Sequence, residues 1–151
     1  MNEFLRQFRS VIEAGWSEAT ISPKFLPIDT TKPLSLGQCA PTSQVLLDEL
    51  REVFPNSDFT LAIGEVRKNG TVVIAYHVWV MELADSPKDS KIIDITADQS
   101  GVLPVVVYDS VRALAEGQIE YISYEQSHGK RFVHEEALRR YEILKESYKK
   151  K

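Results

Sequence analysis

Three strand-like segments, separated by two turn signals, constrain the fold of this chain most. They cover residues 59–66, 71–83 and 92–96. Asn69-Gly70 lies between the first two segments, and an Asn-Gly pair is the strongest short-range signal of a β-hairpin. The stretch 84–90, between the second and third segments, is rich in turn-forming residues. The pattern therefore predicts an antiparallel meander with 71–83 as its middle strand.

An apolar helix is expected just before this meander. Pro41 suits the first turn of a helix, where a missing N–H costs nothing. Apolar residues follow at helical spacing: Val45, Leu46, Leu47, Leu50, Val53 and Phe54. Cys39, the only cysteine of the chain, falls at or just before the start of this helix. Free backbone N–H groups and the helix dipole stabilise a thiolate there and lower the pKa of the thiol.

Two polar residues interrupt the second and third strand-like segments. With a turn centred between Asp85 and Ser86, His77 faces Asp94 on the neighbouring strand, and a bulge or a longer loop would shift this register. A thiol, an imidazole and a carboxylate are the groups that nucleophilic acyl chemistry needs. We therefore predict Cys39, His77 and Asp94 as a catalytic triad. The alternative is that Cys39 is a small buried residue in the core of a binding module.

The same residues resemble a known family. The motifs GQCAPT at 37–42, His77-Val78-Trp79 and IDITADQ at 93–99 resemble those of the small bacterial YunG-like proteins, which read approximately GQC-A-x-T, H-Y-W-N and D-L-T-x-x-Q-F. The likeness begins near Trp16 and weakens after residue 99. It implies an α+β fold with a papain-like (transglutaminase-like) core, in which N-terminal helices, the nucleophile helix among them, pack on an antiparallel sheet and a helix ends the chain. It also implies the triad proposed above.

Three further residues are weaker candidates for oxyanion or substrate contacts. Gln38 matches the family glutamine and could donate to an oxyanion. Trp79 is expected on the same face as His77, where it would line the pocket or belong to the core. Gln99 could hydrogen-bond the triad or the substrate, or be an ordinary turn residue. Two positions depart from the family pattern, since the chain has Val80 where Asn is usual and Ser100 where Phe is usual.

The remaining sequence predicts elements around this centre. Residues 1–14 form an amphipathic helix, and Ser17 caps a short helical turn. The segment 22–36 holds three prolines and is expected to be a loop, serving as a wall of the substrate cleft or as a simple connector. Further expectations are an edge strand at 103–108, a helix at 110–115 that ends at Gly117, and a last amphipathic helix at 132–150.

Composition narrows the function. A length of 151 residues fits one domain, residues 1–151. The net charge of -4, without a basic patch, argues against nucleic acid as a partner. No segment resembles a signal peptide or is long enough to span a membrane, so a cytoplasmic location is expected, although a released effector would look the same. His128 and His134 lack the spacing of metal ligands, and no metal or cofactor is expected.

Together these features predict a cysteine-dependent hydrolase or acyltransferase that forms a thioester on Cys39. The substrate would be a peptide, a protein or a small amide or ester. A catalytically silent papain-like module that binds a protein or small ligand is the alternative. Hydrolysis, deamidation and transfer share the same first step, so the sequence leaves the acceptor open, as it does the oligomeric state.

Overall fold

The computed structural model describes residues 1–127 and 135–151 and shows a mixed α+β fold. Its elements, in chain order, are α1 (Asn2–Glu13), the short 3₁₀ helix η1 (Pro23–Phe25), α2 (Cys39–Val53), β1 (Phe59–Lys68), β2 (Thr71–Glu82), η2 (Pro87–Asp89), β3 (Lys91–Asp94), η3 (Ala97–Ser100), β4 (Val107–Ser110), α3 (Val111–Glu116), β5 (Ile119–Ser127) and α4 (Glu135–Lys149). All neighbouring strands pair antiparallel, in the order β4-β3-β2-β1-β5.

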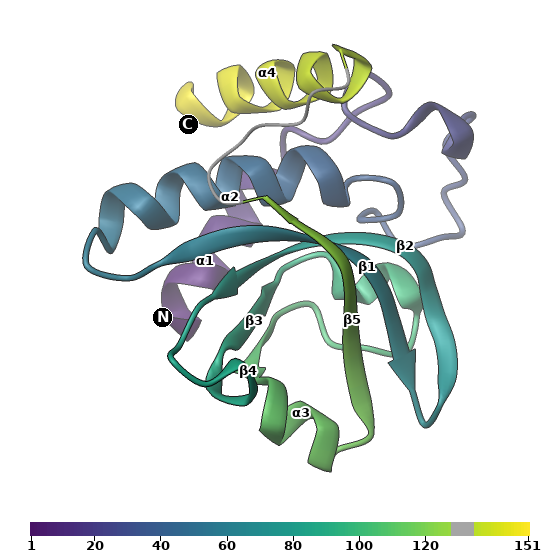
Figure 1. Cartoon of the computed structure of the whole chain (residues 1–151). Coiled ribbons are helices and arrows are strands. Elements are labelled where there is room, and N and C mark those ends of the chain that lie inside the picture. Colours follow the sequence, from purple (N-terminus) through teal and green to yellow (C-terminus); the bar gives the residue numbers. More distant parts are fainter. Residues whose placement is uncertain (128–134) are drawn as a thin grey trace.

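The sheet curls (Figure 1), and a cluster of buried apolar residues lies against each of its faces. Helix α2 runs along one face, α1 lies behind it and α4 lies above it, whereas α3 lies on the far side of the sheet. Val78 and Val80 point into the core shared with α1, α2 and α4. Trp79 and Met81 point into a second core inside the curl. This alternation along β2 follows from the two-residue period of a strand.

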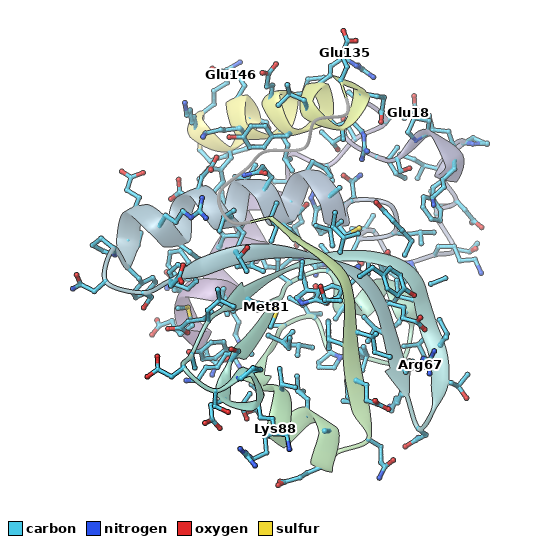
Figure 2. The ribbon with its side chains drawn as sticks, in the orientation of Figure 1. Glu18, Arg67, Met81, Lys88, Glu135 and Glu146 are labelled. Atoms are coloured by element: carbon cyan, nitrogen blue, oxygen red, sulfur yellow. The ribbon has the colours of Figure 1, made fainter. Side chains whose placement is uncertain are left out.

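The side chains in Figure 2 follow these two layers. Charged side chains lie at the outside of the molecule, as the labels show for Glu18, Arg67, Lys88, Glu135 and Glu146. Met81 lies inside the curl and is only 8 % exposed. The interior of the curl is apolar, so a polar side chain buried there needs a hydrogen-bond partner.

The predicted hairpin between β1 and β2 is confirmed. Asn69 and Gly70 both have positive φ, 52° and 77°, as the two central residues of a type I′ turn do. Gly64 marks a second special position, because the pairing of β1 shifts there toward both neighbouring strands. A Cβ on Gly64 would lie 1.8 Å from the carbonyl oxygen of Ile122. Only glycine lets β5 approach β1 this closely, and the sheet bends at the level of His77, which pairs with Gly64.

The predicted register between β2 and β3 is wrong by two residues. Val80 pairs with Ile93 and Met81 with Ile92, whereas a turn centred between Asp85 and Ser86 would pair Val80 with Lys91. The turn is therefore centred between Ser86 and Pro87, one residue later than predicted, and η2 forms its second half. A shift by an even number of residues keeps every side chain on its face, so His77 and Asp94 remain on the same side as diagonal neighbours.

Most other predicted elements are confirmed with small changes of bounds. Helices α1, α2 and α3 lie where expected, and β4 is an edge strand at 107–110 rather than 103–108. Residues 17–20 form a single hydrogen-bonded turn and no helix, and Ser17 caps this turn as predicted, since its Oγ accepts from the N–H of Ala19 at 3.1 Å. Strand β5 was not predicted. Helix α4 is described from Glu135, and the start predicted for it at 132, like His128 and His134, lies outside the described residues.

Candidate active site

The first turn of α2 docks against the edge of β2 and places Cys39. The ladder between β2 and β3 extends only to the pair Val80 and Ile93, so the backbone of Val78 is left for other partners. Ser43 Oγ donates to the carbonyl oxygen of Val78 at 3.0 Å, and the N–H of Val78 donates to the sulfur of Cys39. Cys39 is the first residue of the helix and is 8 % exposed.

His77 lies beside Cys39 and is fully buried. Its Nε2 is 2.7 Å from Oδ2 of Asp94, and its Nδ1 is 3.2 Å from Nε2 of Gln99. Trp79 stacks on the ring with the centroids 5.9 Å apart, as expected from its position two residues further along the strand. The structure therefore brings four of the predicted site residues together around the imidazole: Cys39, Asp94, Trp79 and Gln99.

Asp94, at the end of β3, is 1 % exposed and accepts four hydrogen bonds. Oδ1 accepts from the backbone N–H and the hydroxyl of Thr96, at 2.9 and 3.2 Å. Oδ2 accepts from His77 and from the hydroxyl of Tyr121, each at 2.7 Å. A buried carboxylate is costly unless its oxygens are satisfied. Both oxygens of Asp94 accept hydrogen bonds here, and these bonds also fix the orientation of the carboxylate.

Tyr121 is a residue of the site that the sequence analysis missed. It belongs to β5, which is separated from β3 by β1 and β2 in the strand order, and its hydroxyl reaches Asp94 across the inside of the curl. Its ring packs edge-on against Trp79 with a centroid distance of 5.1 Å. Burial and the charge of Asp94 raise the pKa of Tyr121 well above its usual value, so the phenol stays a hydrogen-bond donor.

The charges of the site support one another. Burial raises the pKa of Cys39, but the hydrogen bond and charge of His77 lower it more, with a net lowering. Burial lowers the pKa of His77, but the charge and hydrogen bond of Asp94 and the thiol of Cys39 raise it to about 10. Burial raises the pKa of Asp94, and His77 more than reverses this. A thiol with a low pKa beside a basic imidazole is the arrangement of a nucleophilic cysteine.

Arg9 of α1 fixes two segments that carry site residues. Its guanidinium donates to both carboxylate oxygens of Asp98 in η3, at 3.0 and 3.1 Å, and to the carbonyl oxygen of Ile95 at 2.7 Å. It also lies 4.7 Å from the ring centroid of Trp16. The indole N–H of Trp16 donates in turn to Thr42 Oγ1, at 2.9 Å, in the first turn of α2. One buried arginine thus ties η3 to the start of the cysteine helix.

Gln38 takes a different position from the one its suggested oxyanion role needs. Its side chain is 2 % exposed and turned toward the 17–20 turn. Oε1 accepts from Thr20 Oγ1 at 2.8 Å, and Nε2 lies 3.4 Å from the carbonyl oxygen of Ser17. These contacts hold the residue before Cys39 in place, and the oxyanion role of Gln38 stays a prediction.

The 22–36 segment packs beside the site. Lys24 lies over the rings of Phe25 and Tyr76, 5.6 and 5.3 Å from their centroids, and Tyr76 directly precedes His77. A pocket of about 120 Å³ lies under this segment, lined by Phe25, Leu34 and Gln38 among others. Cys39 and His77 do not line this pocket, and the role of the segment as a cleft wall stays a prediction.

Comparison with protein-family models, curated proteins and solved structures finds no match to the chain. Among the residues that the structure describes, no group of three His, Cys, Asp or Glu side chains is placed to hold a metal ion. Within the same described ranges, no helix is both long and apolar enough to cross a membrane.

Proposed function

We propose that this protein is a cysteine-dependent hydrolase or acyltransferase with a papain-like (transglutaminase-like) core, acting on an amide or ester carbonyl. One observation carries the proposal. The buried pair of His77 Nε2 and Asp94 Oδ2, 2.7 Å apart, lies beside a cysteine whose pKa His77 lowers. This geometry gives each member of the triad a role that its surroundings support.

The reaction begins with the thiolate of Cys39. The sulfur attacks the carbonyl carbon, and the resulting tetrahedral intermediate expels the amine or alcohol, which takes its proton from Nδ1 of His77. Asp94 holds the Nε2 side of the ring and balances the charge of the imidazolium. Water or an amine then attacks the thioester while His77 accepts its proton, and the C–S bond breaks to release the Cys39 thiolate, which restores the starting ion pair. Backbone N–H groups at the start of α2 are suitable oxyanion donors.

The order of elements supports the papain-like proposal. A helix that starts with the nucleophile is followed by an antiparallel meander with the histidine in its middle strand and the aspartate in the next strand. The same order of Cys, His and Asp underlies the resemblance to the YunG-like proteins. His77 is fully buried and Asp94 is 1 % exposed, whereas 8 % of Cys39 is exposed. Cys39 is thus the most exposed of the three, so the substrate approaches the triad from the side of the sulfur.

The test is to trap the acyl-enzyme. The protein is mixed with p-nitrophenyl acetate, and the mass of the intact chain is followed with time in the wild type, Cys39→Ala and His77→Ala. We expect one acetyl group on the wild type, none in Cys39→Ala at this residue, and acylation slowed by roughly 10²-fold or more in His77→Ala, the usual effect of a general acid or base. Equal acylation rates in the wild type and His77→Ala would refute the enzyme proposal in favour of a binding module.

A further inference from the structure

The orientation of the Gln99 side chain is fixed by Thr96. Nε2 of Gln99 is 3.0 Å from the carbonyl oxygen of Thr96, and a carbonyl oxygen can only accept a hydrogen bond. The atom next to it must therefore be the amide nitrogen. The same nitrogen is 3.2 Å from Nδ1 of His77, so its second hydrogen is directed at the imidazole.

The turn that carries Gln99 is held firmly. Its neighbour Asp98 forms a bidentate ion pair with the buried Arg9, with N–O distances of 3.0 and 3.1 Å. On its other side, Ser100 Oγ donates to the carbonyl oxygen of Ala97 at 2.8 Å. The amide of Gln99 is thus presented to His77 by a fixed element of the fold.

This contact selects one form of the imidazole. An amide N–H can donate to Nδ1 only when Nδ1 carries a lone pair, and the single ring proton must then lie on Nε2, where Asp94 accepts it. Three titratable groups surround the ring: Asp94 from β3, Cys39 from α2 and Tyr121 from β5, 6.5 Å away between ring centroids. Asp94 and Cys39 favour the protonated ring, whereas Gln99 favours the neutral one.

We infer that Gln99 regulates the proposed thiol and imidazole pair, as a positioning residue whose amide N–H stabilises the unprotonated Nδ1 of His77. This inference rests on the proposed function. When Cys39 gives up its proton, the S–H bond breaks and an Nδ1–H bond forms. Two donors, Nδ1–H and the amide N–H, then face each other, so the hydrogen bond between Gln99 and His77 is lost. Forming the thiolate and imidazolium pair thus costs the hydrogen bond between Gln99 and His77. This cost shifts the equilibrium toward the neutral thiol and imidazole pair.

Gln99→Met tests the inference, because Met has a similar length and no amide donor. Ser100→Ala is the control, since it removes three hydrogen bonds of the same turn, to Ala97, Val102 and Leu103, without touching His77. The first readout is the rate of iodoacetamide alkylation of Cys39 against pH. Losing a neutral hydrogen bond should increase the ratio of charged to neutral pairs by about 3- to 10-fold in Gln99→Met, seen as a lower apparent thiol pKa. Ser100→Ala should leave that pKa unchanged.

The second readout is the ¹⁵N NMR spectrum of the His77 ring, which reports protonation of Nδ1 and Nε2 whether or not the protein is an enzyme. The other two histidines of the chain, His128 and His134, are replaced by Gln to isolate its signals. We expect more protonation at Nδ1 in Gln99→Met than in the wild type at neutral pH. Unchanged ring protonation in Gln99→Met would overturn the inference. Alkylation insensitive to His77→Ala would instead count against the proposed function.

Discussion

The hydrogen bond between Tyr121 and Asp94 can be removed almost in isolation. In Tyr121→Phe the ring contacts with Trp79 and His77 remain, and only the hydroxyl that donates to Oδ2 of Asp94 at 2.7 Å is lost. The phenylalanine leaves no unpaired donor behind. The substitution therefore measures what the bond across the curl contributes to stability.

The expected loss follows from the charge of the acceptor. A hydrogen bond to an ionised group contributes about 1.5–3 kcal/mol to the free energy of unfolding. For a chain of 151 residues, each kcal/mol lowers Tm by roughly 2–4 °C, so Tyr121→Phe should lower Tm by about 3–12 °C at pH 7. Tyr124→Phe is the matched control on the same strand. Tyr124 is 61 % exposed and donates to Glu65 at the surface, and its loss should leave Tm unchanged.

The effect should also depend on pH with a defined sign. The pKa of Asp94 is lowered in the folded protein, because His77 and the hydrogen bonds from Thr96 and Tyr121 outweigh burial. A carboxyl with a lowered pKa contributes stability above its unfolded pKa of 3.8, and this stability is lost as the pH falls through the folded pKa. Tyr121→Phe removes one cause of the lowering. The difference in unfolding free energy between variant and wild type should thus be constant from pH 7 to about pH 5 and shrink below that.

Urea unfolding across this pH range, followed by circular dichroism, measures the difference. Equal losses of unfolding free energy in Tyr121→Phe and Tyr124→Phe would show that the hydrogen bond to Asp94 contributes no more stability than the surface hydrogen bond to Glu65. A loss in Tyr121→Phe that persists unchanged into acid would show that it comes from packing and not from the carboxylate. Either result would refute the reasoning that the hydrogen bond between Tyr121 and the Asp94 carboxylate stabilises the curled sheet.

Two further substitutions test the charge of the site and the bend of the sheet. Asp94→Asn keeps an acceptor for His77 but removes the charge that raises the pKa of His77. The weaker imidazole should lower the pKa of Cys39 less, and this effect should exceed the direct repulsion between Asp94 and the thiolate that the substitution also removes. Iodoacetamide alkylation at pH 7 should then slow by about 10- to 100-fold, and an unchanged rate would contradict the charged pair. Gly64→Ala would place a Cβ 1.8 Å from a backbone oxygen of β5 and should cost about 3 kcal/mol or more in urea unfolding, whereas Gly117→Ala, whose Cβ would meet its nearest neighbour at 3.4 Å, should be tolerated.

Local signals predicted the elements that carry the site. Pro41 and the apolar spacing after it gave the helix that begins at Cys39, and Asn69-Gly70 gave the turn between the first two strands. These features act over a few residues, so one sequence displays them directly. The predicted contact between His77 and Asp94 is present although the predicted register is wrong. The error is two residues, and a shift by an even number of residues leaves both side chains on the same face.

Long-range partners left no such trace. Strand β5 carries polar residues at many positions, and nothing within 119–127 shows that Tyr121 must reach a carboxylate on β3, two strands away from the strand it pairs with. The one available signal was Gly64, since glycine inside a strand marks a bulge or a close approach of backbone. It could have predicted that the sheet bends beside His77, but not which strand would close over it.

Arg9 shows how helix α1 contributes to the site without providing a reacting group. Its five N–H donors match the fork of a carboxylate and still leave one for a carbonyl, which a lysine could not do with the same geometry. Through Asp98 it orients the turn of Gln99, and through Trp16 it supports the start of α2. The imidazole thus lies beside two groups, the thiol of α2 and the amide of η3, and Arg9 supports both of these elements. Their competition for Nδ1 is therefore decided by hydrogen bonding at the ring, and not by independent movement of the two elements.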